Sequence, residues 1–131
     1  MGATAYVQQH AAQLDQMKDQ IHILNFDGIG VDGDLRLIAP RRLKGEMAQW
    51  IETSCIELKL PLSRFNLIGA LYDHLPFIER GLDAVTLVAI GKASRSIHTA
   101  QDSIDKLQVR GFDQAGRVAL KIIANVIARS A

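Results

Sequence analysis

Two short segments of the chain carry side chains suited to metal chemistry. Asn25–Gly30 supplies the carboxylate of Asp27 directly after an apolar run, and Ser96–Ser103 supplies the imidazole of His98 just before a predicted helix. Aspartate and histidine are two of the ligand types that hydrolytic zinc sites use, and side chains at the ends of elements can converge on a cleft. Two ligands do not complete a catalytic zinc site, which ordinarily takes three from the protein.

Both candidate ligands have a structural alternative. Thr99 and Asp102 have the spacing of a helix capping box, which would make His98 merely the residue before the N-cap. Capping boxes are common, so the residues alone favour that alternative. Asp27-Gly28 has the composition of a turn and could close a hairpin between two strands. Against the hairpin, Asp27 directly follows the apolar run, at the carboxyl end of a predicted strand.

A third cluster lies in Tyr72–Phe77, where an aspartate and a histidine are adjacent. Asp73 is of a residue type that is common at helix N-caps, and His74 could carry a proton or bind a metal. A Ser-His-Asp triad is not supported, because the chain contains no Gly-x-Ser-x-Gly segment. Dinucleotide binding is not supported either, since Gly28–Gly30 lacks the third glycine in register.

Composition excludes several classes of protein. The formal net charge of +1 gives no electrostatic argument for nucleic-acid binding. Cys55 is the only cysteine, so neither an intramolecular disulfide nor a cysteine-based zinc finger can form. The start of the chain lacks the features of a secretory signal, and the apolar segment 118–128 is too short to span a membrane. We expect one domain, residues 1–131, that as given is soluble and cytoplasmic, although a longer parent could be exported.

The hydrophobic pattern predicts alternating helices and strands. A continuous apolar run at 84–90 is typical of a strand buried on both faces. The order of elements predicts an α/β fold, a three-layer α/β/α sandwich with a mixed, partly parallel sheet. The predicted helices are 4–18, 43–58, 73–80 and 113–129, and the predicted strands are 20–27, 34–39, 64–69 and 84–90.

Taken in order, three motifs resemble the second half of the di-zinc aminopeptidases, a family that also includes carboxypeptidase Q and the glutaminyl cyclases. The resemblance covers nearly the whole chain. The motifs are Asn25-Phe26-Asp27-Gly28-Ile29-Gly30, then Asp73-His74-x-x-Phe77-x-x-x-Gly81-x-x-Ala84-Val85, then His98-Thr99-x-x-Asp102-Ser103-x-Asp105-Lys106-Leu107.

The resemblance implies roles for five residues. Asp27 and His98 would be zinc ligands, each serving a different zinc. Asp73 and His74 would shape the site, and Asp102 would orient the loop of His98 by capping its helix. Two positions depart from the family pattern: Tyr72 stands where serine is common, and Ser103 stands where threonine is usual.

The resemblance further implies a zinc-dependent exopeptidase that acts on peptides with two zinc ions. The family's general-base glutamate, its bridging aspartate and its remaining zinc ligands have no counterpart in this chain. We therefore expect a C-terminal fragment of the catalytic domain that is inactive alone and binds zinc weakly or not at all. The first alternative is a non-catalytic α/β interaction module that keeps the fold. The second, ranked below it, is a cyclase that uses the same scaffold with a single zinc ion. We also expect no nucleic-acid or membrane partner, and self-association as a homodimer through the truncated face.

Overall fold

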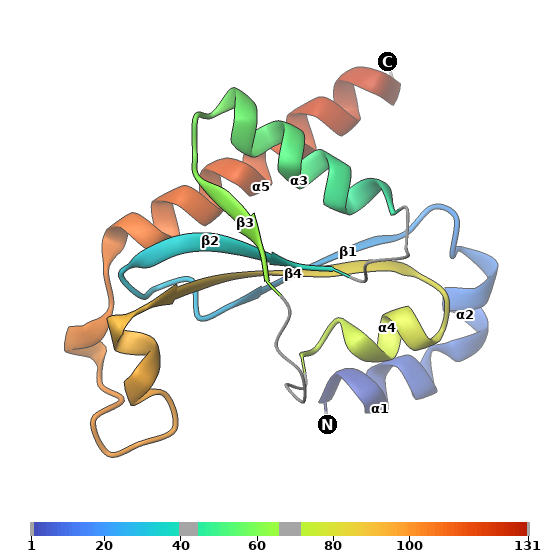
Figure 1. Ribbon diagram of the computed structural model, residues 1–131. Helices are drawn as coiled ribbons and strands as arrows, with labels where there is room; N and C mark the ends of the chain where they lie inside the picture. The colour runs from blue at the N-terminus through green and yellow to red at the C-terminus, as the bar shows by residue number, and fades with distance from the viewer. Residues whose placement is uncertain (1, 40–44, 66–71, 131) are drawn as a thin grey trace.

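A computed structural model describes residues 2–39, 45–65 and 72–130 (Figure 1). Its helices and strands alternate much as the hydrophobic pattern predicts. Among these residues, no helix is both long and apolar enough to cross a membrane. The elements are α1 Gly2–Gln9, α2 Ala11–Gln16, β1 His22–Asp27, β2 Gly33–Ile38, α3 Glu46–Glu57, β3 Leu62–Arg64, α4 Leu75–Glu79, β4 Asp83–Gly91, the 3₁₀ helices η1 Lys92–Ser96 and η2 Ile104–Lys106, and α5 Val109–Ser130.

The four described strands form one mixed sheet in the order β1-β4-β2-β3. Strand β4 runs parallel to β1 and antiparallel to β2, and β2 runs parallel to β3. Residues 84–89 of β4 are all buried, which confirms the predicted central strand. The hairpin alternative for Asp27-Gly28 is wrong, because β4 lies between β1 and β2.

Helices cover both faces of the sheet, which confirms the three-layer architecture. Helices α3 and α5 lie on one face, and α1, α2 and α4 lie on the other (Figure 1). Side chains that alternate along β2 and β4 meet α3 and α5 in the main core, where each buried aliphatic side chain contributes about 1.5–3 kcal/mol. The fully buried members of this core include Leu35, Leu37, Ile51, Leu87 and Val118.

A smaller apolar cluster fixes the helices of the opposite face. Val7 of α1, Leu14 of α2 and Leu82 before β4 are buried together, and Phe77 of α4 packs against them. The ring of Tyr6 also lies 6.2 Å from that of Phe77, between ring centroids. These contacts anchor α4, whose N-cap residue is His74.

Several predicted boundaries are wrong. The helix predicted at 4–18 breaks at His10, whose backbone (φ −103°, ψ 19°) is not helical. The helix predicted at 73–80 is shorter, and His74 rather than Asp73 occupies its N-cap position. The third strand ends at Arg64, and residues 66–69 of the predicted strand lie outside the described residues.

The predicted α-helix after His98 is also wrong. Residues 97–101 form turns, and only the short η2 and then α5 follow. Local side-chain bonds explain the difference, since Thr99 Oγ1 donates to the carbonyl of Ser96 and Ser103 Oγ donates to that of Gln101. Such bonds offer the backbone an alternative to helical hydrogen bonding.

Candidate metal-binding site

The two predicted ligands lie at one edge of the sheet. Asp27 is the last residue of β1, and the parallel β4 ends at Gly91 and leads through η1 to His98. Parallel strands end at the same edge, so residues that follow them are brought together. Both side chains line a cavity of about 460 Å³, whose other lining residues are Gly28, Phe65, Tyr72, Val88, Ala89, Ile90, Ser94 and Ile97.

The backbone of His98 has an unusual conformation. Its φ is +65°, a left-handed value that residues other than glycine rarely adopt. Asp102 stabilises this turn, because its Oδ2 accepts a hydrogen bond from the His98 N–H at 3.2 Å. Thr99 Oγ1 adds a second bond by accepting from the N–H of Gln101. Asp102 thus contacts the loop of His98 directly, rather than through the cap of an α-helix.

The side chains of Asp27 and His98 remain available to a ligand. Both residues are exposed, and neither side chain has a hydrogen-bond or ion-pair partner among the described residues. Tyr72 lies near this carboxylate: burial, and then the charge of Asp27, raises the pKa of the Tyr72 phenol. Its hydroxyl therefore stays protonated, and a donor, across the neutral range.

A buried hydrogen-bonded chain underlies the cavity. Asn25 Nδ2 donates to Thr86 Oγ1 at 3.0 Å, and Thr86 Oγ1 lies 2.7 Å from His74 Nδ1. Thr86 and His74 are 0% and 1% exposed, and burial lowers the pKa of His74. A hydroxyl that accepts from Asn25 can donate its own proton to Nδ1 of a neutral imidazole. The chain ties α4 to β4 and to β1, two residues before Asp27.

Asp73 and His74 are adjacent in sequence but lie in different environments. The His74 side chain is buried and hydrogen-bonded to Thr86. Asp73 is exposed in the turn before α4 and does not line the cavity. The structure therefore brings Asp27 and His98 to one cavity, places His74 beneath it, and leaves Asp73 outside its lining.

Arg36 is a neighbour of the site that the sequence did not single out. In the register, Arg36 pairs with Val88 and Val88 pairs with Asp27, so the three lie in one row on one face of the sheet. Arg36 Nε is buried without a hydrogen-bond partner among the described residues. The alternation of side chains along β2 could have predicted the face of the sheet on which Arg36 lies. Only the strand order shows that Arg36 lies in the same row as Asp27.

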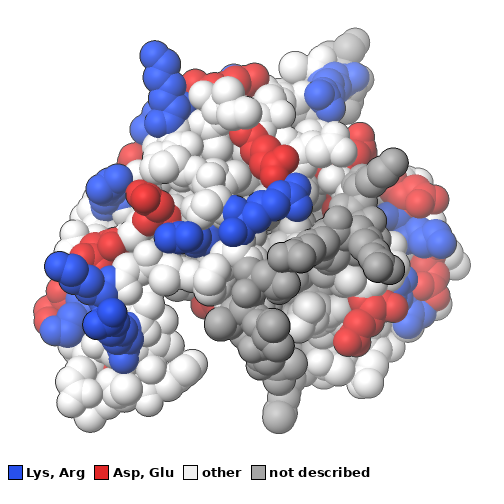
Figure 2. Space-filling view, viewed as in Figure 1, with Lys and Arg blue, Asp and Glu red and all other residues white. Residues whose placement is uncertain are grey.

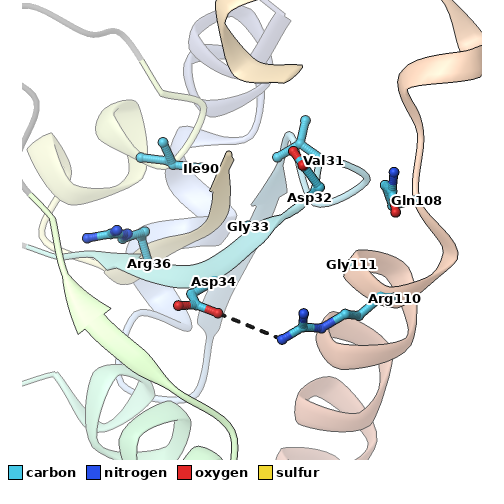
Figure 3. A pocket seen from close by; sticks show the side chains of 9 residues that line it. All are labelled: Val31, Asp32, Gly33, Asp34, Arg36, Ile90, Gln108, Arg110 and Gly111. Atoms are coloured by element: carbon cyan, nitrogen blue, oxygen red, sulfur yellow. Dashed lines mark ion pairs between the residues drawn. The ribbon is translucent and has the colours of Figure 1, made fainter. Parts of the chain in front are cut away.

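Arg36 also lines a second cavity of about 390 Å³, beside β2 and the amino end of α5 (Figure 3). There Arg110 reaches from α5 to Asp34, with Nη2 3.9 Å from Oδ1. Figure 2 shows charges of both signs interspersed on the face that it displays, with no single-sign field. The charged residues that line the second cavity are balanced, with Asp32 and Asp34 against Arg36 and Arg110.

The donors fit zinc in kind but not in number. Imidazole nitrogen and carboxylate oxygen are ordinary zinc ligands, but catalytic zinc takes three from the protein. Within residues 2–39, 45–65 and 72–130, no group of three or more His, Cys, Asp or Glu side chains could hold a metal ion. A zinc ion bound by Asp27 or His98 therefore needs further ligands from outside this part of the chain.

Comparisons with solved structures show the same fold in aminopeptidases. The chain superposes on a zinc aminopeptidase from Bacillus subtilis with a TM-score of 0.78 at 19% identity, over 95% of this chain and 32% of the other. For the aminopeptidase of Aneurinibacillus sp. strain AM-1 the TM-score is 0.72 at 22% identity, with coverage of 93% and 29%. The LapA aminopeptidase of Legionella pneumophila gives 0.74 at 16%, with 92% and 34%.

The chain spans about a third of the length of these aminopeptidases. A search of curated protein sequences finds no match. The model of peptidase family M28, in contrast, matches residues 1–123, which is nearly the whole sequence. The chain belongs to peptidase family M28.

Proposed function

We propose that Asp27 and His98 supply two ligands to the zinc centre of an aminopeptidase-like enzyme that hydrolyses peptide bonds. The observation that carries the proposal is their convergence: Asp27 ends β1, His98 follows the parallel β4, both line one cavity, and neither side chain has a partner among the described residues. Each would serve a different zinc ion, as the resemblance to the di-zinc aminopeptidases implies. A peptide is the substrate of the complete enzyme.

The chain's own residues hold and orient this half of the site. Asp102 fixes the backbone of His98, and the buried chain that ends at His74 fixes the end of β1. Tyr72 keeps its proton and can donate a hydrogen bond into the cavity. When bound, zinc supplies a Lewis acid that polarises the scissile carbonyl and makes water a better nucleophile.

We propose that the 131-residue chain is inactive alone. Hydrolysis at such a site needs a general base to take the proton of the attacking water. The glutamate that performs this step in the family has no counterpart here, and neither does the bridging aspartate. The purified chain with added zinc should hydrolyse aminoacyl-nitroanilides no faster than zinc alone. Hydrolysis that a chelator abolishes would overturn this part of the proposal.

The alternative is a non-catalytic interaction module that keeps the peptidase fold. Its support is the shortage of ligands, since the part of the chain that the structure describes offers two donors at the cavity. The DNA upstream of the codon for Met1 distinguishes the two. An in-frame sequence with a zinc-binding histidine, an aspartate and a Glu-Glu pair would support the enzyme. An upstream sequence without them would support the module.

A further inference from the structure

Helix α5 has a second apolar face outside the main core, of which Phe112 alone is seen to pack within the described chain, with its ring close to Gly30. Its core-facing side chains include Ala115, Val118 and Ile122, which are at most 5% exposed. Leu120 is two residues from Val118, and at about 100° per residue it points nearly the opposite way. We call this second face the α5 stripe. Its members and their exposed fractions are Val109 84%, Phe112 46%, Leu120 69%, Ile123 54% and Ile127 64%, together with the exposed Gly116.

The α5 stripe is continuous along the helix. Its residues follow one another in steps of three or four, so each lies about one turn from the next. Val109 and Ile127 are 18 residues apart, which is five turns at 3.6 residues per turn, so the two side chains point in the same direction. A surface helix normally turns polar residues away from the core. This helix instead presents apolar side chains to solvent along almost its full length.

Gly116 lies in the middle of the α5 stripe, and the fold does not require a glycine there. A Cβ at this position would meet nothing within 4 Å, and the residue has no positive φ. Glycine inside a helix is destabilising relative to alanine. A small residue at this point is useful where a second helix approaches closely.

The α5 stripe is complementary to itself about a two-fold axis. If two α5 helices pack antiparallel around residue 118, Val109 lies opposite Ile127, and Phe112 lies opposite Ala124, one residue from Ile123. Leu120 then lies opposite Gly116 of the other copy, so a large side chain faces a small one. The same surface serves both copies, as a two-fold interface demands. This matching favours a second copy of the chain over an unrelated partner.

The exposed area is sufficient for a stable pair. An aromatic side chain has roughly 150–250 Å² of surface, and an aliphatic one has somewhat less. The exposed parts of the five large side chains therefore amount to roughly 500 Å² per copy, within the range of the largest apolar patches found on monomers. A pair that covers all of it would bury about 1,000 Å², the least area expected of a biological interface.

We infer that the chain forms an isologous homodimer through the α5 stripe, with the two α5 helices antiparallel and Leu120 packed on Gly116 of the other copy. The contact depends on α5 alone and is independent of any metal at Asp27 or His98. The proposed dimer and the proposed peptidase function can therefore fail separately.

Sedimentation velocity of the full chain over a wide range of concentrations tests the dimer. The wild-type chain should reach twice its monomer mass of 14.4 kDa. Leu120→Glu should weaken dimerisation at least tenfold, because it would bury a charge against an apolar helix. Gly116→Leu should do the same by steric overlap, although a Cβ at this position meets nothing within 4 Å in the monomer. Circular dichroism checks that both variants stay folded.

Ile56→Glu is the matched control. Ile56 is 77% exposed on α3, outside the α5 stripe, so the same change of chemistry there should leave dimerisation unaltered. A wild-type chain that remains monomeric at high concentration would overturn the inference. So would a dimer that survives both Leu120→Glu and Gly116→Leu, or one that Ile56→Glu dissociates as readily as Leu120→Glu does.

Discussion

Both ends of the β1–β4 pair carry an aspartate and a histidine, and the two pairs differ in what they contact. At one end, Asp83 Oδ2 accepts hydrogen bonds from His22 Nδ1 and from the Met47 N–H, both at 2.8 Å. At the other end, Asp27 and His98 line an open cavity, and their side chains have no partner among the described residues. The same side-chain types are therefore structural at one end and available at the other.

The contacts of Asp83 explain why the first pair is structural. Gly45, the N-cap of α3, has no side chain with which to cap the helix, and Asp83 of β4 takes that role by accepting from Met47. His22 also packs on Trp50 of α3, with ring centroids 4.5 Å apart. A polar pair whose bonds are satisfied stabilises the fold, whereas an unpartnered pair on a cavity can bind a ligand at little cost to stability.

The largest expected effect is that of Asp83→Ala. The change removes the cap of α3 and leaves the His22 ring and the Met47 N–H without their acceptor. Loss of this cap, which is the Met47 N–H bond, costs about 1 kcal/mol, and the partly buried His22 ring left unsatisfied adds about as much again. We expect the free energy of unfolding, measured in urea, to fall by about 2 kcal/mol. A loss below about 1 kcal/mol would contradict the structural role of this pair.

Next in size is a pH dependence carried by His74. Its pKa is lowered by burial from the ordinary value of 6.5, so the unfolded chain binds this proton more readily than the folded chain does. The contribution of His74 to stability is constant above the unfolded pKa and falls as pH drops below it, by at most about 1.4 kcal/mol per pH unit. His74→Asn keeps a polar atom near Thr86 but does not titrate. Urea unfolding from pH 7 to pH 5 should therefore be less pH-dependent in the variant, and an unchanged slope would refute the assignment.

A smaller effect is expected at His98, whose backbone is left-handed. His98→Gly should be about 1 kcal/mol more stable than His98→Ala, because only glycine adopts this conformation without strain. Thermal unfolding of the two variants measures the difference. Equal stabilities would mean that the turn adopts another conformation in solution.

The smallest effect is that of Asp27→Ala on stability. Asp27 is exposed and unpartnered among the described residues, so its loss should change the free energy of unfolding by less than about 0.5 kcal/mol. A larger loss, approaching that of Asp83→Ala, would erase the distinction between the two ends of the β1–β4 pair.

The fold class could be predicted because its signals are local and periodic. The apolar run at 84–90 identified the central strand, and the position of Asp27 directly after an apolar run identified a strand end. The turn after His98 could not be predicted, because the capping pattern of Thr99 and Asp102 is equally compatible with a helix. Only the folded loop shows Asp102 bonded to the His98 backbone instead.

Contacts between segments far apart in the sequence could not be predicted for a different reason. The bond from His22 to Asp83 spans 61 residues, and the row from Asp27 to Arg36 depends on β4 lying between β1 and β2. Alternation tells which face a side chain takes, but it does not tell which strands are neighbours. The resemblance of three ordered motifs to the di-zinc aminopeptidases predicted Asp27 and His98 as ligands. The strand order explains how the two residues come to line one cavity.

The central claim, that Asp27 and His98 are the zinc-binding pair, is tested most directly by a zinc titration of the chain followed through the NMR signals of its four histidine rings. The ring signals of His98 should shift, weakly and at high zinc concentration, and Asp27→Ala should leave that shift in place, because Asp27 serves the other zinc ion. The signals of His22, held by Asp83, and of the buried His74 should stay in place. Unchanged His98 signals, or His22 responding before His98, would contradict the claim.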